Sequence, residues 1–459
     1  MATIDATGSV LVQSPTPKSF DAYPNADPED VQFWASYLVP RFRMYLAEAS
    51  SYTVKQQEAH ASCFSAAVEA LGPRHPHPYV KSVMTPNSSP IELSLNLSED
   101  RPPTVRFYLE PLGYETGTDE DPFGELWTPH SFSCLAAQVA SVDARWYQHL
   151  REAFRLKDKN EINKAKTGNC PGVWLPTMFM GIDFVGDHRL LKCSFCPIRK
   201  LLAMGADWNH LADHNQFVLD VVRQLPGFGA NARAALDVLG QYIVESPKTT
   251  ASVRGDGVGG GLEDSGIKRE TGSGAKRPMP FFNLVSVDCS DLNKGRVKLY
   301  ARINSTSFAS IRDAVTLGGR LTDEVTMDGL RHLQSVWHLL LNDPTIKNDT
   351  GYARPVDPVS ICQGIDINWE ISEKLPVPHA KVYVPVHIFH ANDVEVNRNL
   401  CQIFKKLQWN DWAEGRYEVM LQRVFPEADF ATSHINTWVS FCYYKGRGSY
   451  MTMYHNPLF

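Results

Sequence analysis

The chain has 459 residues, and its 45 lysines and arginines against 51 aspartates and glutamates give a net charge of −6. A hydrophobic content of 43% and a charged content of 21% are ordinary for globular proteins, so a wholly disordered chain is excluded. The acidic balance argues against nucleic-acid binding, which normally needs a net basic surface. No segment is apolar over the length that a membrane span requires, and the N-terminus lacks a basic stretch followed by an apolar run. We therefore expect a cytoplasmic protein, neither embedded in a membrane nor secreted.

The nine cysteines are sparse for a chain of this length and indicate reduced thiols rather than a disulfide framework. Cys193 and Cys196 form a single CxxC motif, but no second cysteine or histidine pair follows at the spacing of a zinc site. We interpret them as buried strand cysteines and predict no metal site.

Two segments differ in composition from the rest of the chain. Residues 1–27 are rich in Ser, Thr and Pro, which predicts a disordered leader. Residues 246–280 contain a run of glycines, but no helix start follows it, as a phosphate-binding loop would require. We interpret this segment as a flexible insertion in a single domain that spans residues 28–459.

The remaining sequence repeats the order helix, helix, strand, strand five times. The rounds are 28–49, 54–71, 91–97 and 104–110; 131–155 with a looser connection, 177–185 and 190–196; 207–225, 229–244, 281–289 and 296–304; 307–316, 323–342, 362–372 and 379–386; and 391–407, 411–424, 433–445 and 449–456. Helical spacing is clear in the last round, where apolar residues recur every three or four positions. Asn392 with Glu395 resembles a capping box at its start.

Each pair of adjacent strands predicts an antiparallel hairpin, and five hairpins supply ten strands. A large antiparallel sheet avoids exposed edges by closing into a barrel. Helices on the outside require the outward strand residues to be apolar, so the polar alternate residues face the interior. Ten strands leave more room than side chains fill, which predicts an α+β fold with one polar, ligand-sized chamber.

The second strand of each round carries a polar face that recurs at equivalent positions. The alternation of a strand places its cationic residues on that face: Arg106, Lys192, Arg296, Lys298 and Lys381. Five converging cations repel one another unless an anion lies between them, and a polyphosphate matches arginine and lysine donors well. For each residue taken alone, a solvated strand face is the alternative.

Four tyrosines share these faces: Tyr300, Tyr383, Tyr450 and Tyr454. Their hydroxyls can donate to phosphate oxygens and their rings attract a cation, although packing between strands is the alternative. A diphosphate site together with rings that shield a cation indicates ionisation of an allylic diphosphate.

The first strand of the first round places Glu92 on the inward face, opposite in direction to Leu93. A carboxylate in a chamber is costly unless it is paired, so we expect it to hold an N–H or O–H of an electron-rich ring. An ion pair with one of the cations remains open. Met84 and Trp174 are candidates for the acceptor pocket, with core packing as the alternative.

Several common enzyme motifs are missing from the sequence. There is no paired acidic DDxxD run for magnesium, and no GxSxG, HExxH or GxGxxG between strand and helix. Hydrolase, zinc-protease and dinucleotide-binding functions are therefore not favoured. Cationic side chains would have to supply the charge that magnesium supplies elsewhere.

Over roughly residues 30 to 456 the sequence resembles the fungal aromatic prenyltransferases of the dimethylallyl tryptophan synthase family, which have the ABBA barrel of ααββ repeats. The motifs that carry the resemblance are PIELSLNL (90–97), VRFYLEPLGYETGTDEDPF (105–123), RVKLYAR with TSF and TLGGR (296–320), KVYVPV (381–386) and YMTMY (450–454). The resemblance implies that the five cations bind the diphosphate, with Lys298 also catalytic, that the four tyrosines shield the dimethylallyl cation, and that Glu92 is catalytic and holds the acceptor.

Two departures from the family pattern bear on the acceptor. Ser194 stands where members often have Tyr or Thr, and PTMFMGIDF (176–184) lacks the lysine that tryptophan-using members carry there as a proposed base. The resemblance thus implies transfer of a dimethylallyl group from dimethylallyl diphosphate to an indole larger than free tryptophan, such as a cyclic dipeptide, without a metal or other cofactor. A phenolic polycycle as acceptor, or a non-catalytic barrel that binds an anionic small molecule, are the alternatives. We expect a monomer or homodimer.

Overall fold

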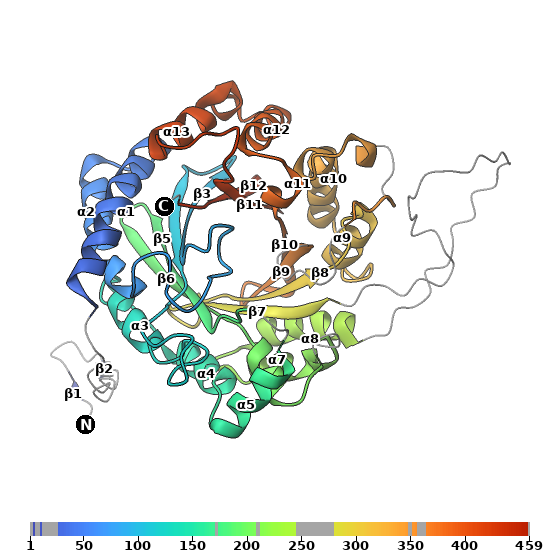
Figure 1. Ribbon diagram of the computed structural model, residues 1–459. Coiled ribbons are helices and arrows are strands. Elements are labelled where there is room, and N and C mark those ends of the chain that lie inside the picture. The colour runs from blue at the N-terminus through green and yellow to red at the C-terminus, as the bar shows by residue number, and fades with distance from the viewer. Residues whose placement is uncertain are drawn as a thin grey trace.

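Ten strands form a closed ring with helices around its outside, as viewed down the barrel in Figure 1. The computed structural model describes residues 26–169, 173–207, 212–244, 280–347, 351–355 and 364–457, and two short strands near the N-terminus, β1 (Thr3–Ile4) and β2 (Val10–Leu11), which pair antiparallel. The predicted insertion and most of the predicted leader lie outside the described residues.

The barrel strands follow one another around the ring in chain order, and every neighbouring pair is antiparallel. The ring closes where the last strand pairs with the first, with Met453 opposite Leu95. The strands are β3 (Ile91–Ser98), β4 (Thr104–Leu109), β5 (Met178–Val185), β6 (His188–Phe195), β7 (Phe281–Asp288), β8 (Val297–Ile303), β9 (Ile365–Ser372), β10 (Leu375–Val384), β11 (Asn436–Tyr444) and β12 (Gly448–His455). The predicted ten-stranded barrel of five repeats is confirmed.

Several helices begin at side chains that accept backbone N–H groups. Asp27 accepts from Glu29 at 2.8 Å, and Asn392 accepts from Glu395 as expected, although the Glu395 carboxylate bonds to Ala391 instead. The helices are α1 (Pro28–Ala49), α2 (Val54–Ala67), α3 (Thr128–Ala136), α4 (Arg145–Phe154), α5 (Lys159–Gly168), α6 (Ile198–Ala203), α7 (Asn215–Arg223), α8 (Ala230–Val244), α9 (Phe308–Val315), α10 (Glu324–Leu340), α11 (Val386–Phe389), α12 (Asp393–Lys406) and α13 (Tyr417–Val424). Shorter turns of helix are η1 (Val68–Leu71), η3 (Pro344–Lys347) and η4 (Trp412–Arg416).

The second and third repeats differ from the prediction. The expected helix over 131–155 is two helices, because α3 ends at Ala136 and α4 begins only at Arg145, whose backbone N–H donates to the side chain of Asp143 at 3.1 Å. The expected helix over 207–225 is shorter, since α7 begins at Asn215 and residues 208–211 lie outside the described residues.

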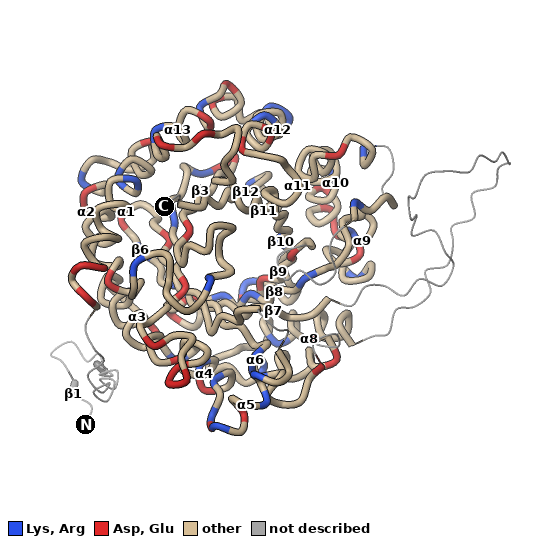
Figure 2. Tube along the Cα trace, viewed as in Figure 1, with Lys and Arg blue, Asp and Glu red and all other residues tan. Residues whose placement is uncertain are grey.

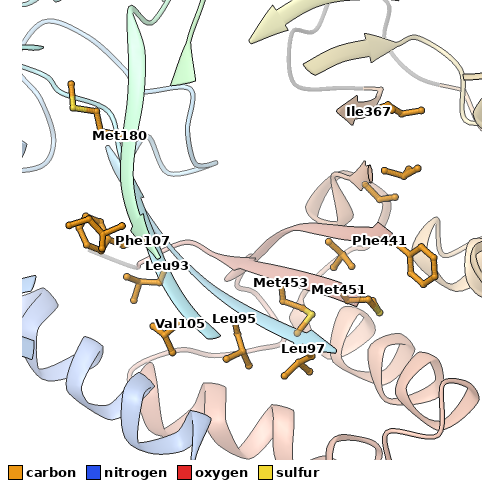
Figure 3. Packing of buried hydrophobic residues seen from close by; sticks show 14 of the residues in the cluster. Leu93, Leu95, Leu97, Val105, Phe107, Met180, Ile367, Phe441, Met451 and Met453 are labelled. Atoms are coloured by element: carbon orange, nitrogen blue, oxygen red, sulfur yellow. The ribbon is translucent and has the colours of Figure 1, made fainter. Parts of the chain in front are cut away.

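The outward faces of the strands form the core. Leu93, Leu95, Val105 and Phe107 are fully buried and point from β3 and β4 toward the surrounding helices, as Figure 3 shows. Burying such side chains contributes about 1.5–3 kcal/mol each, so the coat of helices and the barrel stabilise one another. None of the described helices is both long and apolar enough to cross a membrane.

The segment between η1 and β3 crosses one open end of the barrel (Figure 1). We call residues 79–90 the strap. The strap is pinned by the side chain of Asn87, which donates to the carbonyl of Pro457 at 2.8 Å. Val83 and Met84 of the strap face the interior, so this segment forms part of the wall of the chamber.

Candidate active site

The inward faces of the strands enclose a chamber of about 710 Å³. Its lining includes Met84 and Glu92 together with the five predicted cations, Arg106, Lys192, Arg296, Lys298 and Lys381, and the four predicted tyrosines, Tyr300, Tyr383, Tyr450 and Tyr454. Because side chains alternate between the two faces of a strand, these residues all face the chamber, as the sequence predicts. Figure 2 shows Lys and Arg positions gathered on the barrel strands around β8.

Carboxylates from neighbouring strands separate the cations. Asp183 on β5 bonds both Lys192 and, at 3.2 Å, Arg106. Asp288 on β7 lies 2.6 Å from Arg296, which also reaches Glu370 on β9 at 3.3 Å. Arg302 and Asp366 form a further pair at 2.8 Å.

We expected a polyphosphate as the anion between the five cations, and the structure places carboxylates of the protein itself among them. The charges of Arg106 and Lys192 lower the pKa of Asp183 well below its usual value, although burial alone would raise it. The cluster thus holds its own counter-charges and is compatible with a folded chamber before any ligand enters. Asp183, Asp288 and Glu370 stand on the inward-facing alternate positions of the first strand in the second, third and fourth hairpins, and this is the signal that could have found them.

Two lysines of this cluster, Lys298 and Lys381, are not paired with a carboxylate in the described residues, unlike the arginines. Within the described part of the chain, Lys298 makes no hydrogen bond or ion pair. The ammonium of Lys381 donates to Thr452 at 3.1 Å and lies 4.6 Å from the ring centre of Tyr450. Burial lowers the pKa of Lys381 to about 7, and the charges of Arg106, Lys298 and Lys192 act in the same direction. Lys381 would therefore gain charge when an anion binds in the chamber.

The tyrosines form a connected aromatic wall. The hydroxyls of Tyr300 and Tyr383 lie 3.4 Å apart, and the ring centres of Tyr383 and Tyr454 are 6.1 Å apart. Tyr450 accepts a hydrogen bond from Arg106 at 2.6 Å, which joins the aromatic wall to the cations. Tyr108 and Tyr444 also line the chamber and were not assigned a role from the sequence.

Glu92 lies in the chamber wall with 8% of its surface exposed. In the described residues its carboxylate makes no ion pair, and its partner is the hydroxyl of Thr437, which donates at 3.1 Å. Burial raises the pKa of Glu92 to about 8, opposed by the Thr437 hydrogen bond. The structure therefore does not have the ion pair between Glu92 and a barrel cation that was the alternative.

Met84 and Trp174 occupy different places. Met84 lines both the chamber and an adjoining outer pocket, whereas Trp174 lines the outer pocket alone. The indole N–H of Trp174 donates to the carboxylate of Glu110 at 2.6 Å. Glu110 directly follows β4, and burial raises its pKa to about 7 despite the hydrogen bonds that it accepts. Glu110 carries no periodic signal beyond its place on a polar strand face, so its contacts could not be foreseen.

The two cysteines of the CxxC motif are buried, as predicted. Cys193 lies on the outward face of β6, and Cys196 directly follows this strand. The Cys193 sulfur is 3.7 Å from that of Cys289 in the outer layer, whereas Cys196 lines the chamber. Among the described residues, no group of three or more His, Cys, Asp or Glu side chains is arranged to hold a metal ion.

A barrel of this kind, with a cationic and aromatic interior, defines a class of prenyl-transferring enzymes, and the comparisons with known proteins agree. The sequence model of the tryptophan dimethylallyltransferase family matches residues 30–420. The chain therefore belongs to this family and is a prenyltransferase.

Curated relatives are similar along nearly their whole length. The indole prenyltransferase tdiB of Emericella nidulans is 29% identical, with 92% of this chain and 94% of tdiB covered. The reverse prenyltransferase criA of Aspergillus cristatus is 28% identical, with 95% and 92% covered. Among solved structures, AnaPT from Neosartorya fischeri has a TM-score of 0.73 at 21% identity, covering 94% of this chain and 95% of AnaPT. NotF in complex with brevianamide F and DMSPP has a TM-score of 0.72 at 24% identity, covering 96% and 97%. These structural likenesses support the fold.

Proposed function

We propose that this enzyme transfers a dimethylallyl group from dimethylallyl diphosphate to an indole-containing acceptor by electrophilic aromatic substitution. The observation that carries the proposal is the single chamber in which a cation cluster, an aromatic wall and a buried carboxylate meet. The names of tdiB, an indole prenyltransferase, and of the NotF complex with brevianamide F and DMSPP support the same donor and acceptor classes.

In the first step the bond between the allylic carbon and the bridging oxygen breaks, and the electron pair leaves with the diphosphate. Lys298, Arg296 and Lys381 would stabilise the charge that develops on the leaving oxygen, together with Arg106 and Lys192. Donors fixed in place before the reaction stabilise such charge without reorganisation. The carboxylates between the cations would hold them at their positions.

In the second step the allyl cation forms beside the aromatic wall, whose ring faces attract positive charge and keep water away. The acceptor ring attacks the cation and forms the new carbon bond. Glu92 would hold the N–H of the acceptor and accept the displaced ring proton, directly or through a water molecule. A buried carboxyl that lacks a cationic partner is suited to this task.

The cationic side chains would stabilise the diphosphate charge that magnesium stabilises at other diphosphate sites, so we propose that the reaction needs no metal. Turnover in the presence of EDTA is expected to match turnover without it. Loss of activity in EDTA that added magnesium restores would contradict the proposal.

The function is tested by incubating the enzyme and dimethylallyl diphosphate with a panel of tryptophan, larger indoles, cyclic dipeptides and phenolic polycycles. Mass spectrometry is expected to show the gain of one C5 unit on an indole of the panel, and NMR of the product identifies the position. Gain on the phenols alone would assign the acceptor class to phenols. If pyrophosphate binds and no acceptor of the panel gains mass, the proposed acceptor class is wrong.

Binding of pyrophosphate is expected to take up protons. Because the pKa of Lys381 is about 7, this lysine is largely neutral above that pH and must gain a proton to pair with the anion. At about pH 7.5 the wild type should take up roughly three-quarters of a proton more than Lys381→Met, measured by calorimetry in two buffers of different ionisation enthalpy. The difference should vanish near pH 6, where Lys381 is already charged. Equal uptake by the two proteins at both pH values would contradict this assignment.

A further inference from the structure

The carboxylate of Glu110 joins two segments that are far apart in the sequence. One oxygen accepts from the hydroxyl of Ser82 at 2.5 Å, and the other accepts from the indole N–H of Trp174 at 2.6 Å. Glu110 is 1% exposed, so both bonds lie away from water. Hydrogen bonds to a carboxylate are shorter and stronger than those between neutral groups. We call Glu110, Ser82 and Trp174 the clasp.

The clasp holds the strap from inside. Ser82 belongs to the strap, and its oxygen also accepts the backbone N–H of Met84 at 3.1 Å. At the other end of the strap, the backbone N–H of Glu110 donates to the carbonyl of Pro90 at 2.7 Å. Glu110 therefore fixes the segment that places Met84 in the chamber wall.

The clasp also holds the wall opposite the strap. Trp174 is followed directly by Leu175 and Pro176, both of which line the chamber. Trp174 itself lines the outer pocket, together with strap residues from Tyr79 to Ser88. Val83, Met84 and Trp438 line both spaces, so the strap is the partition between them.

We propose that Glu110 is a positioning residue that holds the strap and the segment of Trp174 as the wall of the acceptor end of the chamber. This inference rests on the proposed function for the identity of the ligand, and it assigns a task to a buried carboxyl that the diphosphate chemistry does not use. The segments that Glu110 ties line the outer pocket and the adjoining wall of the chamber, whereas the cations form pairs with Asp183, Asp288 and Glu370 on the barrel strands. Loss of the clasp therefore acts on acceptor binding and leaves the diphosphate site as it is.

Two substitutions remove one bond of the clasp each, and the control for each makes the same change of side-chain size elsewhere in the chain. Trp174→Phe removes the N–H, and Ser82→Ala removes the hydroxyl. Their matched controls are Trp127→Phe and Ser131→Ala, because these buried side chains donate to the carbonyl of Ala70, away from both spaces. Glu110→Gln keeps one acceptor oxygen and is expected to show a smaller effect than Glu110→Ala.

The first readout is kinetic, on an acceptor that the panel identifies. Trp174→Phe and Ser82→Ala are expected to raise the acceptor KM about tenfold, as the loss of a bond to a charged group implies, while kcat and the KM for dimethylallyl diphosphate change less than about twofold. A merely structural role would move both KM values and kcat together. Acceptor KM values equal to those of the two controls would overturn the proposal.

The second readout needs no turnover. Hydrogen exchange of the backbone amides of residues 79–90 is expected to quicken about tenfold in Trp174→Phe, Ser82→Ala and Glu110→Ala, and to stay at the wild-type rate in the two controls. If the wild-type enzyme prenylates nothing, the proposed function fails, and the exchange rates still decide whether the clasp holds the strap. Exchange of these backbone amides at the wild-type rate in Glu110→Ala would overturn the proposal that the clasp holds the strap.

Discussion

Replacing Lys298 with alanine is expected to lower kcat/KM for dimethylallyl diphosphate about a thousandfold. Lys298 lines the chamber on β8 and is not committed to a carboxylate in the described residues, so its ammonium is free to meet the leaving oxygen. Loss of one fixed donor to a developing oxyanion costs two to three orders of magnitude, roughly, in other enzymes. The measurement is steady-state turnover, with circular dichroism to show that the variant is folded.

The control for this variant is Lys294→Ala. Lys294 lies in the turn between β7 and β8, and its side chain is 80% exposed. Both variants lose one positive charge, but only Lys298→Ala loses it inside the barrel. Near-normal activity of Lys298→Ala would contradict the diphosphate assignment.

Replacing Glu92 with glutamine is expected to lower kcat about a thousandfold and to remove one limb of the pH profile. With a pKa of about 8, the carboxyl is mainly protonated at neutral pH, and only its ionised form accepts a proton from the acceptor ring. The wild-type kcat/KM for the acceptor should therefore rise as the pH rises through about 8. Glu92→Gln lacks this carboxyl, so the rise of kcat/KM through about pH 8 should be absent from its profile.

Thr437→Val provides an independent check on the same group. The Thr437 hydroxyl donates to the carboxylate and so lowers the pKa of Glu92, which burial raises. Without this bond the pKa should increase, and the rising limb should move to higher pH. A limb that persists in Glu92→Gln, or does not move in Thr437→Val, would assign the titration to another residue.

The barrel could be predicted because its signal is local. Alternation along β8 places Lys298 and Tyr300 on one face and Leu299 on the other, and every hairpin repeats this pattern. The recurrence of the pattern in five hairpins then implies a closed ring. The same alternation predicted the cations, the tyrosines and Glu92, which all line the chamber.

The pairing of charges could not be predicted in this way. Asp183 meets Arg106 across β4 and β5, and Glu370 lies opposite Lys298 across β8 and β9, so each contact depends on the register between two strands. Alternation gives the face of a residue and not its neighbour on the next strand. The contacts of Trp174 depend on irregular segments, for which the sequence has no period at all.

The separation of the two strand faces has a consequence for how such enzymes diverge. Ser194 faces the chamber, whereas its neighbours Cys193 and Phe195 are buried in the layer against the helices. A substitution at Ser194 changes the shape offered to an acceptor and leaves the packing that stabilises the barrel intact. Substitutions at uncharged inward positions such as Ser194 therefore cost little stability, and descendants of one ancestral barrel can acquire new acceptors one residue at a time.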